Sequence, residues 1–134
     1  MKKRAISSLL VLALLVSGIW ASAVEISPMW SYLSTVIRTL DTDGSDLEWG
    51  TVASAYAVQG VTSVKVSVQL QRYGTSWVMV ASDTETESGN IGYAGGTYTN
   101  WTSGQRYRMV TNVTIYGGTT VLEQVGPLYD YLNT

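Results

Sequence analysis

The chain contains no cysteine, no histidine and no phenylalanine, and only two prolines among its 134 residues. Without cysteine it has no disulfide framework, which is the usual support of small exported domains. Without histidine and cysteine it also lacks the commonest general base, the usual nucleophile and base pairs, and ordinary zinc or copper ligands. Carboxylates are the groups that remain for acid and base chemistry. We therefore expect a protein that is not an enzyme.

The first 23 residues have the order of an export signal. A basic stretch at residues 2–4 precedes an apolar run that reaches Trp20, and Ala21 and Ala23 form an A-x-A cleavage site. A membrane anchor is the alternative, but the unbroken apolar part, Leu9–Val16, is much shorter than the roughly 20 residues that cross a bilayer. We expect cleavage after Ala23 and a secreted, extracellular protein.

Removal of residues 1–23 changes the charge of the protein. Three of the eight basic residues leave with the signal and all ten acidic residues stay, so residues 24–134 carry a net charge of −5. A negative surface repels phosphate backbones and anionic lipid headgroups, so we expect no nucleic-acid partner and no membrane contact after cleavage. Residues 24–134 have the length of one domain, and no linker or repeat divides them.

Alternation of apolar and polar side chains predicts β-strands. In Val64–Gln71 every second side chain is apolar, and Arg106–Tyr116 repeats the pattern. A period of two places one face of each strand in a core and the other in water. Weaker strands are expected at Leu33–Leu40, Leu47–Tyr56, Trp77–Ser82, Ile91–Trp101 and Thr119–Val125. About seven short strands separated by glycine-containing turns predict an all-β antiparallel sandwich.

The segment Gly104–Met109 resembles the entry to a central strand of immunoglobulin-like and fibronectin III-like sandwiches, in which a tyrosine ties the preceding loop to the strand. The resemblance implies a structural role for Tyr107, with a buried ring and a hydrogen-bonded hydroxyl. We therefore expect an immunoglobulin-like antiparallel β-sandwich of about seven strands after an N-terminal signal helix.

Two longer stretches carry a second resemblance. They are Val64–Tyr73 with Trp77, and Gly104–Arg108 with Tyr116–Gly118 and Glu123. Together they are similar to a group of small, signal-bearing proteins of Gram-positive bacteria that carry a domain of unknown function. This resemblance implies secretion and an immunoglobulin-like sandwich, and it brings no activity or catalytic residue with it.

One acidic cluster suggests a metal site. Asp41, Asp43, Asp46 and Glu48 surround a glycine, and oxygen ligands spaced in this way converge on a hard cation such as Ca²⁺. Glu48 comes too early for the glutamate that ends an EF-hand loop, and flanking helices are not expected. The alternative is an Asp/Gly turn between two strands. Calcium is the one cofactor for which the sequence gives a candidate site.

A second acidic group alternates with threonines. Asp83, Glu85 and Glu87 have period-two spacing, so all three are expected on one face of an edge strand. Charge on an edge strand blocks pairing with other sheets, and we favour this role over metal binding.

Aromatic residues are the other binding candidates. A flat platform for sugar rings or a peptide is one interpretation of Trp77, Trp101, Tyr93, Tyr98, Tyr116, Tyr129 and Tyr131. A core without phenylalanine needs other large side chains, so we assign Trp49, Trp77 and Tyr107 to packing. Tyr129 and Tyr131, near the end of the sequence, fit a core less well.

These patterns favour a secreted, non-catalytic binding or interaction module whose partner is an unknown extracellular protein or glycan. Two alternatives stay open. One is a carboxylate-dependent hydrolase that uses the acids between Asp41 and Glu48, and the other is a calcium-binding extracellular structural protein that assembles through edge strands.

Overall fold

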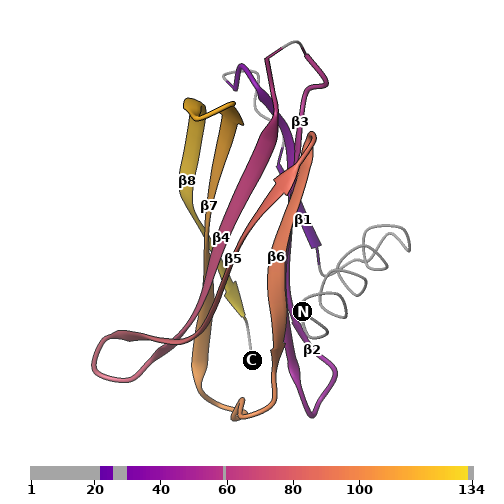
Figure 1. Cartoon of the computed structure of the whole chain (residues 1–134). Coiled ribbons are helices and arrows are strands. Elements are labelled where there is room, and N and C mark those ends of the chain that lie inside the picture. The colour runs from indigo at the N-terminus through magenta and orange to yellow at the C-terminus, as the bar shows by residue number, and fades with distance from the viewer. Residues whose placement is uncertain (1–21, 26–29, 59, 133–134) are drawn as a thin grey trace.

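The computed structural model describes residues 22–25, 30–58 and 60–132, which form eight β-strands and no helix (Figure 1). The strands are β1 (Ser22–Glu25), β2 (Leu33–Thr42), β3 (Leu47–Ala55), β4 (Ser63–Tyr73), β5 (Trp77–Ser88), β6 (Ile91–Tyr98), β7 (Arg106–Gly117) and β8 (Thr120–Leu132). The seven strands expected from the sequence correspond to β2–β8, and β1 is an additional short strand.

The described strands form two sheets in which all neighbours are antiparallel. One sheet has the order β1-β2-β3-β6 and the other has the order β5-β4-β7-β8. Figure 1 shows the two sheets face to face, and the chain passes between them after β3, β5 and β6. The predicted all-β antiparallel sandwich is therefore confirmed.

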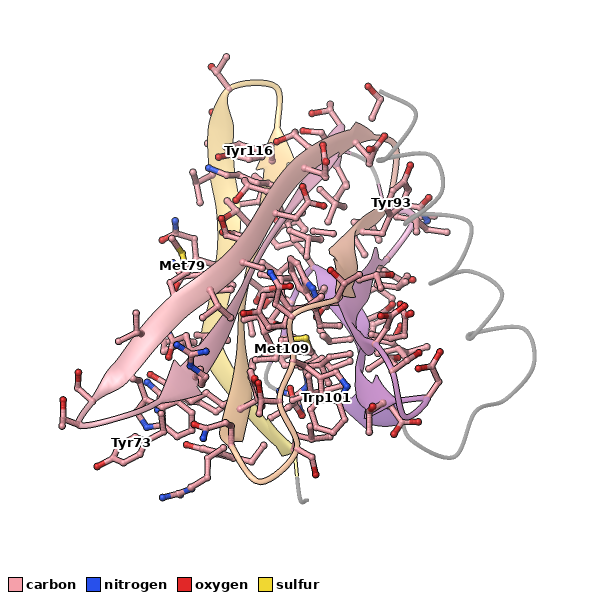
Figure 2. All side chains as sticks on the ribbon, turned by 90° about the horizontal axis from the view of Figure 1, so that it is seen from below. Tyr73, Met79, Tyr93, Trp101, Met109 and Tyr116 are labelled. Atoms are coloured by element: carbon pink, nitrogen blue, oxygen red, sulfur yellow. The ribbon has the colours of Figure 1, made fainter. Side chains whose placement is uncertain are left out.

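The core lies between the sheets and is built by period-two alternation. The inner face of β4 contributes Val64, Val66, Val68 and Leu70, all fully buried, and β7 adds Tyr107, Met109, Val113 and Ile115. Met109 lies between the sheets in Figure 2, whereas Met79 lies on the outside. Each fully buried Val or Leu side chain contributes about 1.5–3 kcal/mol.

Two polar pairs also lie in the interior. The hydroxyls of Thr51 on β3 and Thr111 on β7 are 2.8 Å apart and link the two sheets through a buried hydrogen bond. Arg38 on β2 forms an ion pair with Asp130 on β8 at 3.3 Å. Buried polar groups are tolerated when they are paired, and these pairs also fix how one sheet sits on the other.

Along one side of the sandwich, the edge strand β5 lies beside β6 of the other sheet. Asp83, Glu85 and Glu87 share the face of β5 that points inward, while the threonines between them are exposed. Asp83 accepts a hydrogen bond from the Gly95 N–H at 3.0 Å and so connects the two sheets. The predicted placement of these acids on one face of an edge strand is confirmed.

Glu123 closes the opposite side of the sandwich, between β8 and the start of β2. Its carboxylate accepts hydrogen bonds from the backbone N–H groups of Ser31, Tyr32 and Leu33 at 2.8–2.9 Å. Partial burial raises the pKa of Glu123, but the three backbone donors outweigh it and hold the pKa below its ordinary value.

The N-terminal predictions fall mostly outside the described residues. The signal helix and Ala21 lie in residues 1–21, outside the described part, whereas Ala23 lies in β1 and is paired with Arg38 of β2. Cleavage after Ala23 would therefore divide β1, and it stays a prediction. Within the described ranges, no helix is long and apolar enough to span a membrane.

Candidate functional site

The acidic cluster proposed as a calcium site forms the turn between β2 and β3. One oxygen of Asp43 accepts hydrogen bonds from the Asp46 N–H at 2.9 Å and from the N–H and hydroxyl of Ser45. The backbone hydrogen bonds from Asp46 and Ser45 hold the pKa of Asp43 below its ordinary value. This carboxylate therefore stabilises its own turn, as Asp commonly does.

Two of the other three acids, Asp41 and Glu48, also bond within the fold, whereas Asp46 contributes its backbone N–H and carbonyl to the turn. Asp41 accepts the Thr42 N–H at 2.9 Å, and Glu48 accepts the Thr97 hydroxyl at 2.8 Å. Burial raises the pKa of Glu48, and the nearby charges of Asp43 and Asp46 raise it further, against the bond from Thr97. No three acidic side chains of the described residues are grouped to hold a metal ion. The calcium site stays a prediction that the geometry of this turn does not support.

The seven aromatic residues considered as a platform do not lie on one surface. Tyr98 and Trp101 pack against the buried ring of Tyr107, and Figure 2 shows Tyr93 and Tyr116 at separate places on the molecule. Only three of the seven, Trp77, Tyr129 and Tyr131, come together on one face.

Of the three aromatic residues that were expected to pack in the core, two are buried there and one is not. Trp49 and Tyr107 are buried in the core, as expected. The Tyr107 hydroxyl accepts the Thr102 N–H at 2.9 Å, so this tyrosine ties the loop before β7 to the strand. The assignment of Trp77 to the core is wrong, because its partly buried side chain lies on the outer face of the sheet and packs against Tyr73.

That outer face carries the candidate site. The aromatic–arginine face consists of six side chains on the sheet β5-β4-β7-β8, next to the β4–β5 turn: Tyr73, Trp77, Arg106, Arg108, Tyr129 and Tyr131. Strand register brings them together. Tyr73 is paired with both Trp77 and Arg106, and Arg108 is paired with Tyr131. Side chains paired across antiparallel strands point to the same face.

The two guanidinium groups alternate with the rings. Arg108 lies between Trp77 and Tyr129, with distances of 4.4 and 4.9 Å to the ring centroids. Arg106 lies 5.2 Å from the centroid of Tyr73 and 5.7 Å from that of Trp77. Each such cation–π contact contributes about 0.5–1 kcal/mol at an exposed position. The contacts therefore hold both cations in a fixed array.

Hydrogen bonds restrict Arg108 further. Its Nε–H donates to the side-chain oxygen of Gln71 at 2.7 Å, and the Gln71 amide donates to Gln69 at 3.0 Å. The terminal nitrogens of Arg108 keep their own N–H donors, because a guanidinium carries five in all. The side chain is thus oriented by its inner end, and its outer end is available to a ligand.

The face is open to solvent and extends onto the β4–β5 hairpin. Tyr129 is 45% exposed and Tyr131 is 53% exposed. Met79 on β5, which is paired with Gln71 and therefore lies on the same side of the sheet, is also exposed. An exposed cluster of large apolar side chains on a small protein marks a place of interaction.

A hollow of about 430 Å³ opens where β7 begins and β8 ends. It is lined by Trp77, Arg106, Tyr107, Tyr131 and Leu132. Three of these residues belong to the aromatic–arginine face, so the face leads into a depression at its edge. Its described lining includes one cation and no carboxylate.

Three members of this face, Tyr73, Arg106 and Arg108, were not predicted from the sequence. All three are polar or amphipathic residues at outward positions of alternating strands, where exposure to water is the ordinary expectation. The available signal was the short turn at Gly74–Ser76, which fixes Tyr73 opposite Trp77. The pairing of β4 with β7 is needed to place the arginines.

No protein-family model matches the chain, and neither a curated protein nor a solved structure does. The resemblance to small proteins of Gram-positive bacteria therefore stays a prediction. The candidate site rests on its geometry alone.

Proposed function

We propose that this protein is a secreted, non-catalytic, immunoglobulin-like sandwich that binds an extracellular ligand through the aromatic–arginine face. The export pattern of residues 1–23 supports secretion. The immunoglobulin-like assignment is supported by the two antiparallel sheets and by the hydrogen bond from Thr102 to Tyr107 at the entry to β7.

The observation that carries the proposal is the exposed, ordered array of rings and guanidinium groups. Tyrosine, tryptophan and arginine are the residue types that dominate binding energy at interfaces. Here they are held by mutual contacts of 4.4–6.0 Å rather than free to rotate. A preordered site loses less side-chain entropy when a ligand binds.

Packing against the hydrophobic core does not explain why all six side chains of the aromatic–arginine face lie together. The tip of the β4–β5 hairpin extends beyond the body of the sandwich in Figure 1, and Tyr73 lies at this tip in Figure 2. Tyr73 and Trp77 contact each other and the two arginines. Neither ring belongs to the hydrophobic core cluster.

A binding role fits the described acids better than acid–base catalysis does. Asp43 and Glu48 accept hydrogen bonds within the β2–β3 turn or from β6, and Asp83 and Glu123 connect the edges of the sheets. These carboxylates stabilise the fold, and none of them lines the hollow beside Trp77.

Retention of ligands by the full chain tests the proposal. The immobilised protein is exposed to a glycan array and to solubilised cell-surface material, and it is compared with Trp77→Ala and Tyr129→Ala. Tyr56→Ala is the matched control, because Tyr56 is also 45% exposed and lies between β3 and β4, at the other end of β4 from the face.

Loss of one central aromatic side chain is expected to weaken retention about tenfold or more. The control is expected to bind as the unchanged protein does, and circular dichroism confirms that all variants are folded. Equal retention by Trp77→Ala and the unchanged protein, or no retained ligand at all, would refute the proposal.

A further inference from the structure

We infer that the aromatic–arginine face binds an acidic polysaccharide, whose carboxylate or phosphate groups are held by Arg106 and Arg108. This inference rests on the proposed function and names its ligand class.

Among residues 22–25, 30–58 and 60–132, neither of the two arginines has a carboxylate partner. Residues 24–134 contain five basic side chains, and one of them, Arg38, pairs with Asp130 inside the sandwich. In the part of the chain that the structure describes, Arg106 and Arg108 contact aromatic rings and Gln71, and neither contacts a carboxylate. Both positive charges are therefore available to an external anion.

The arrangement favours oxyanions over uncharged sugars. Planar guanidinium groups bind carboxylate and phosphate through paired N–H donors, which neutral hydroxyls do not match. Arg108 covers the Trp77 ring at 4.4 Å, so that side of the ring is not free to stack on a sugar. Recognition of negative charge by the arginines is thus the main contribution of this face to ligand binding.

A polar strip continues from the arginines along the outer face of the sheet. It contains Gln71, Gln69, Ser67 and Lys65 on β4, with Asn112 and Thr114 paired to the last two on β7. Ser67 also shares a hydrogen bond of 2.9 Å with Thr84 on β5. Amide and hydroxyl groups in a row suit the hydroxyls of a sugar chain, and Lys65 adds a cation at the far end.

The length of the strip suits a polymer. The seven residues from Lys65 to Gln71 span about 20 Å at the rise of a β-strand. An extended acidic peptide would instead call for pockets that accept alternate side chains. The polar strip complements a polyhydroxylated chain, and this favours a glycan over a peptide.

The net charge of −5 does not oppose this assignment, because none of the described acidic side chains lies on this outer face. Asp83, Glu85 and Glu87 are on β5 of the same sheet, but they point to its inner side. Asp41, Asp43, Asp46 and Glu48 belong to the β2–β3 turn of the other sheet. At physiological salt, charges separated by more than about 8 Å are largely screened. The local charge of the face, rather than the net charge, decides its ligand.

Binding of defined polymers to the full chain tests the inference by isothermal titration calorimetry. The probes are polygalacturonate with its methyl ester, phosphomannan with mannan, and poly-L-glutamate. The test variant is Arg106→Gln/Arg108→Gln. The control is Arg72→Gln, which removes one positive charge, as Arg106→Gln alone does, from β4 at a position paired with Tyr107, on the opposite side of the sheet. The single variant Arg106→Gln, at an exposed position, replaces the double variant as the test variant if the double variant does not fold.

We expect at least one acidic polymer to bind about tenfold or more tightly than its neutral partner, and the two acidic probes distinguish carboxylate from phosphate. The double variant is expected to lose about tenfold or more in affinity, and Arg72→Gln less than twofold. Arginine-to-lysine changes at both positions are expected to lose affinity as well, because lysine keeps the charge but not the planar fork.

Equal binding of acidic and neutral polymers, or poly-L-glutamate that binds as tightly as the acidic glycans, would overturn the inference. So would equal losses in Arg72→Gln and in the double variant. Retention of another ligand through Trp77, with no binding of either acidic polymer, would overturn this inference while the proposed function stands.

Discussion

The guanidinium of Arg108 on β7 lies 4.4 Å from the ring centroid of Trp77 on β5, although β4 lies between these two strands. The two side chains meet above Gln71 of β4, which fixes the inner end of Arg108 through a hydrogen bond of 2.7 Å. Three strands thus contribute to one contact, and the hairpin that carries Trp77 is fastened to the centre of the sheet.

This contact predicts a measurable coupling between the two residues. In a double-mutant cycle of Trp77→Ala and Arg108→Ala, chemical denaturation is expected to give a coupling energy of about 0.5–1 kcal/mol. A cycle between Trp77 and Arg72, on the other side of the sheet, serves as the control and is expected to give close to zero. Additive effects of Trp77→Ala and Arg108→Ala would show that the contact does not hold the face together.

The bond between Tyr107 and Thr102 predicts a cost for removal of one hydroxyl. Tyr107→Phe keeps the buried ring but leaves the Thr102 N–H without its acceptor, so the free energy of unfolding is expected to fall by about 1–2 kcal/mol. Tyr56→Phe, at an exposed position, is the control and is expected to change stability very little. Equal stabilities of the two variants, measured in urea, would contradict the role of Tyr107 as a tie between loop and strand.

The buried pair Thr51 and Thr111 predicts a non-additive result. Either single change to valine leaves the other hydroxyl buried without this partner and is expected to cost about 1–3 kcal/mol. The double change replaces both hydroxyls by methyl groups and is expected to be more stable than either single variant. A double variant that loses the sum of the two single effects would show that the hydroxyls do not act as a pair.

Glu123 predicts a dependence of stability on pH. Its pKa in the folded protein is held below the ordinary value of 4.5, so its contribution is present above that value and is lost as the pH falls through the folded pKa. Glu123→Gln is therefore expected to be less stable than the unchanged protein at about pH 7, with a difference that shrinks toward about pH 3. Denaturant unfolding at both pH values measures the difference.

Glu48→Gln is the control for this pH dependence. Burial raises the pKa of Glu48, so ionisation of this group disfavours the folded state and its removal is expected to act with the opposite sign near neutral pH. If the difference in unfolding free energy between the unchanged protein and Glu123→Gln does not vary with pH, the ionised Glu123 carboxylate does not stabilise the fold through its backbone hydrogen bonds.

The strands were predictable because their alternation reflects burial directly. The valines of β4 and the inward residues of β7 alternate with polar residues, and a sheet with one buried face requires that pattern. The ends were less predictable. β5 continues to Ser88 and β8 to Leu132, well beyond the predicted ends at Ser82 and Val125. Inward-facing Asp83, Glu85 and Glu87 on β5, and Gly126 with Pro127 on β8, interrupt the apolar pattern without ending the strands.

The candidate site was less accessible to sequence reasoning. Arg106 and Arg108 join Trp77 only through the register of β4 with β5 and of β4 with β7, and nothing local in the sequence states the second pairing. The acids from Asp41 to Glu48 are visible as a cluster in the sequence, but the sequence does not decide their role. The same Asp and Gly residues favour a cation site and a tight turn, and here the carboxylates of Asp41, Asp43 and Glu48 accept hydrogen bonds within the fold.

The most direct test of the binding face is to observe its arginines during binding. In the full chain labelled with ¹⁵N-arginine, the Nε–Hε resonances of Arg38, Arg72, Arg106 and Arg108 are followed while polygalacturonate is added. If the polymer binds at the aromatic–arginine face, the resonances of Arg106 and Arg108 shift and those of Arg38 and Arg72 do not. Polymer binding that leaves the resonances of Arg106 and Arg108 unchanged would contradict binding at this face.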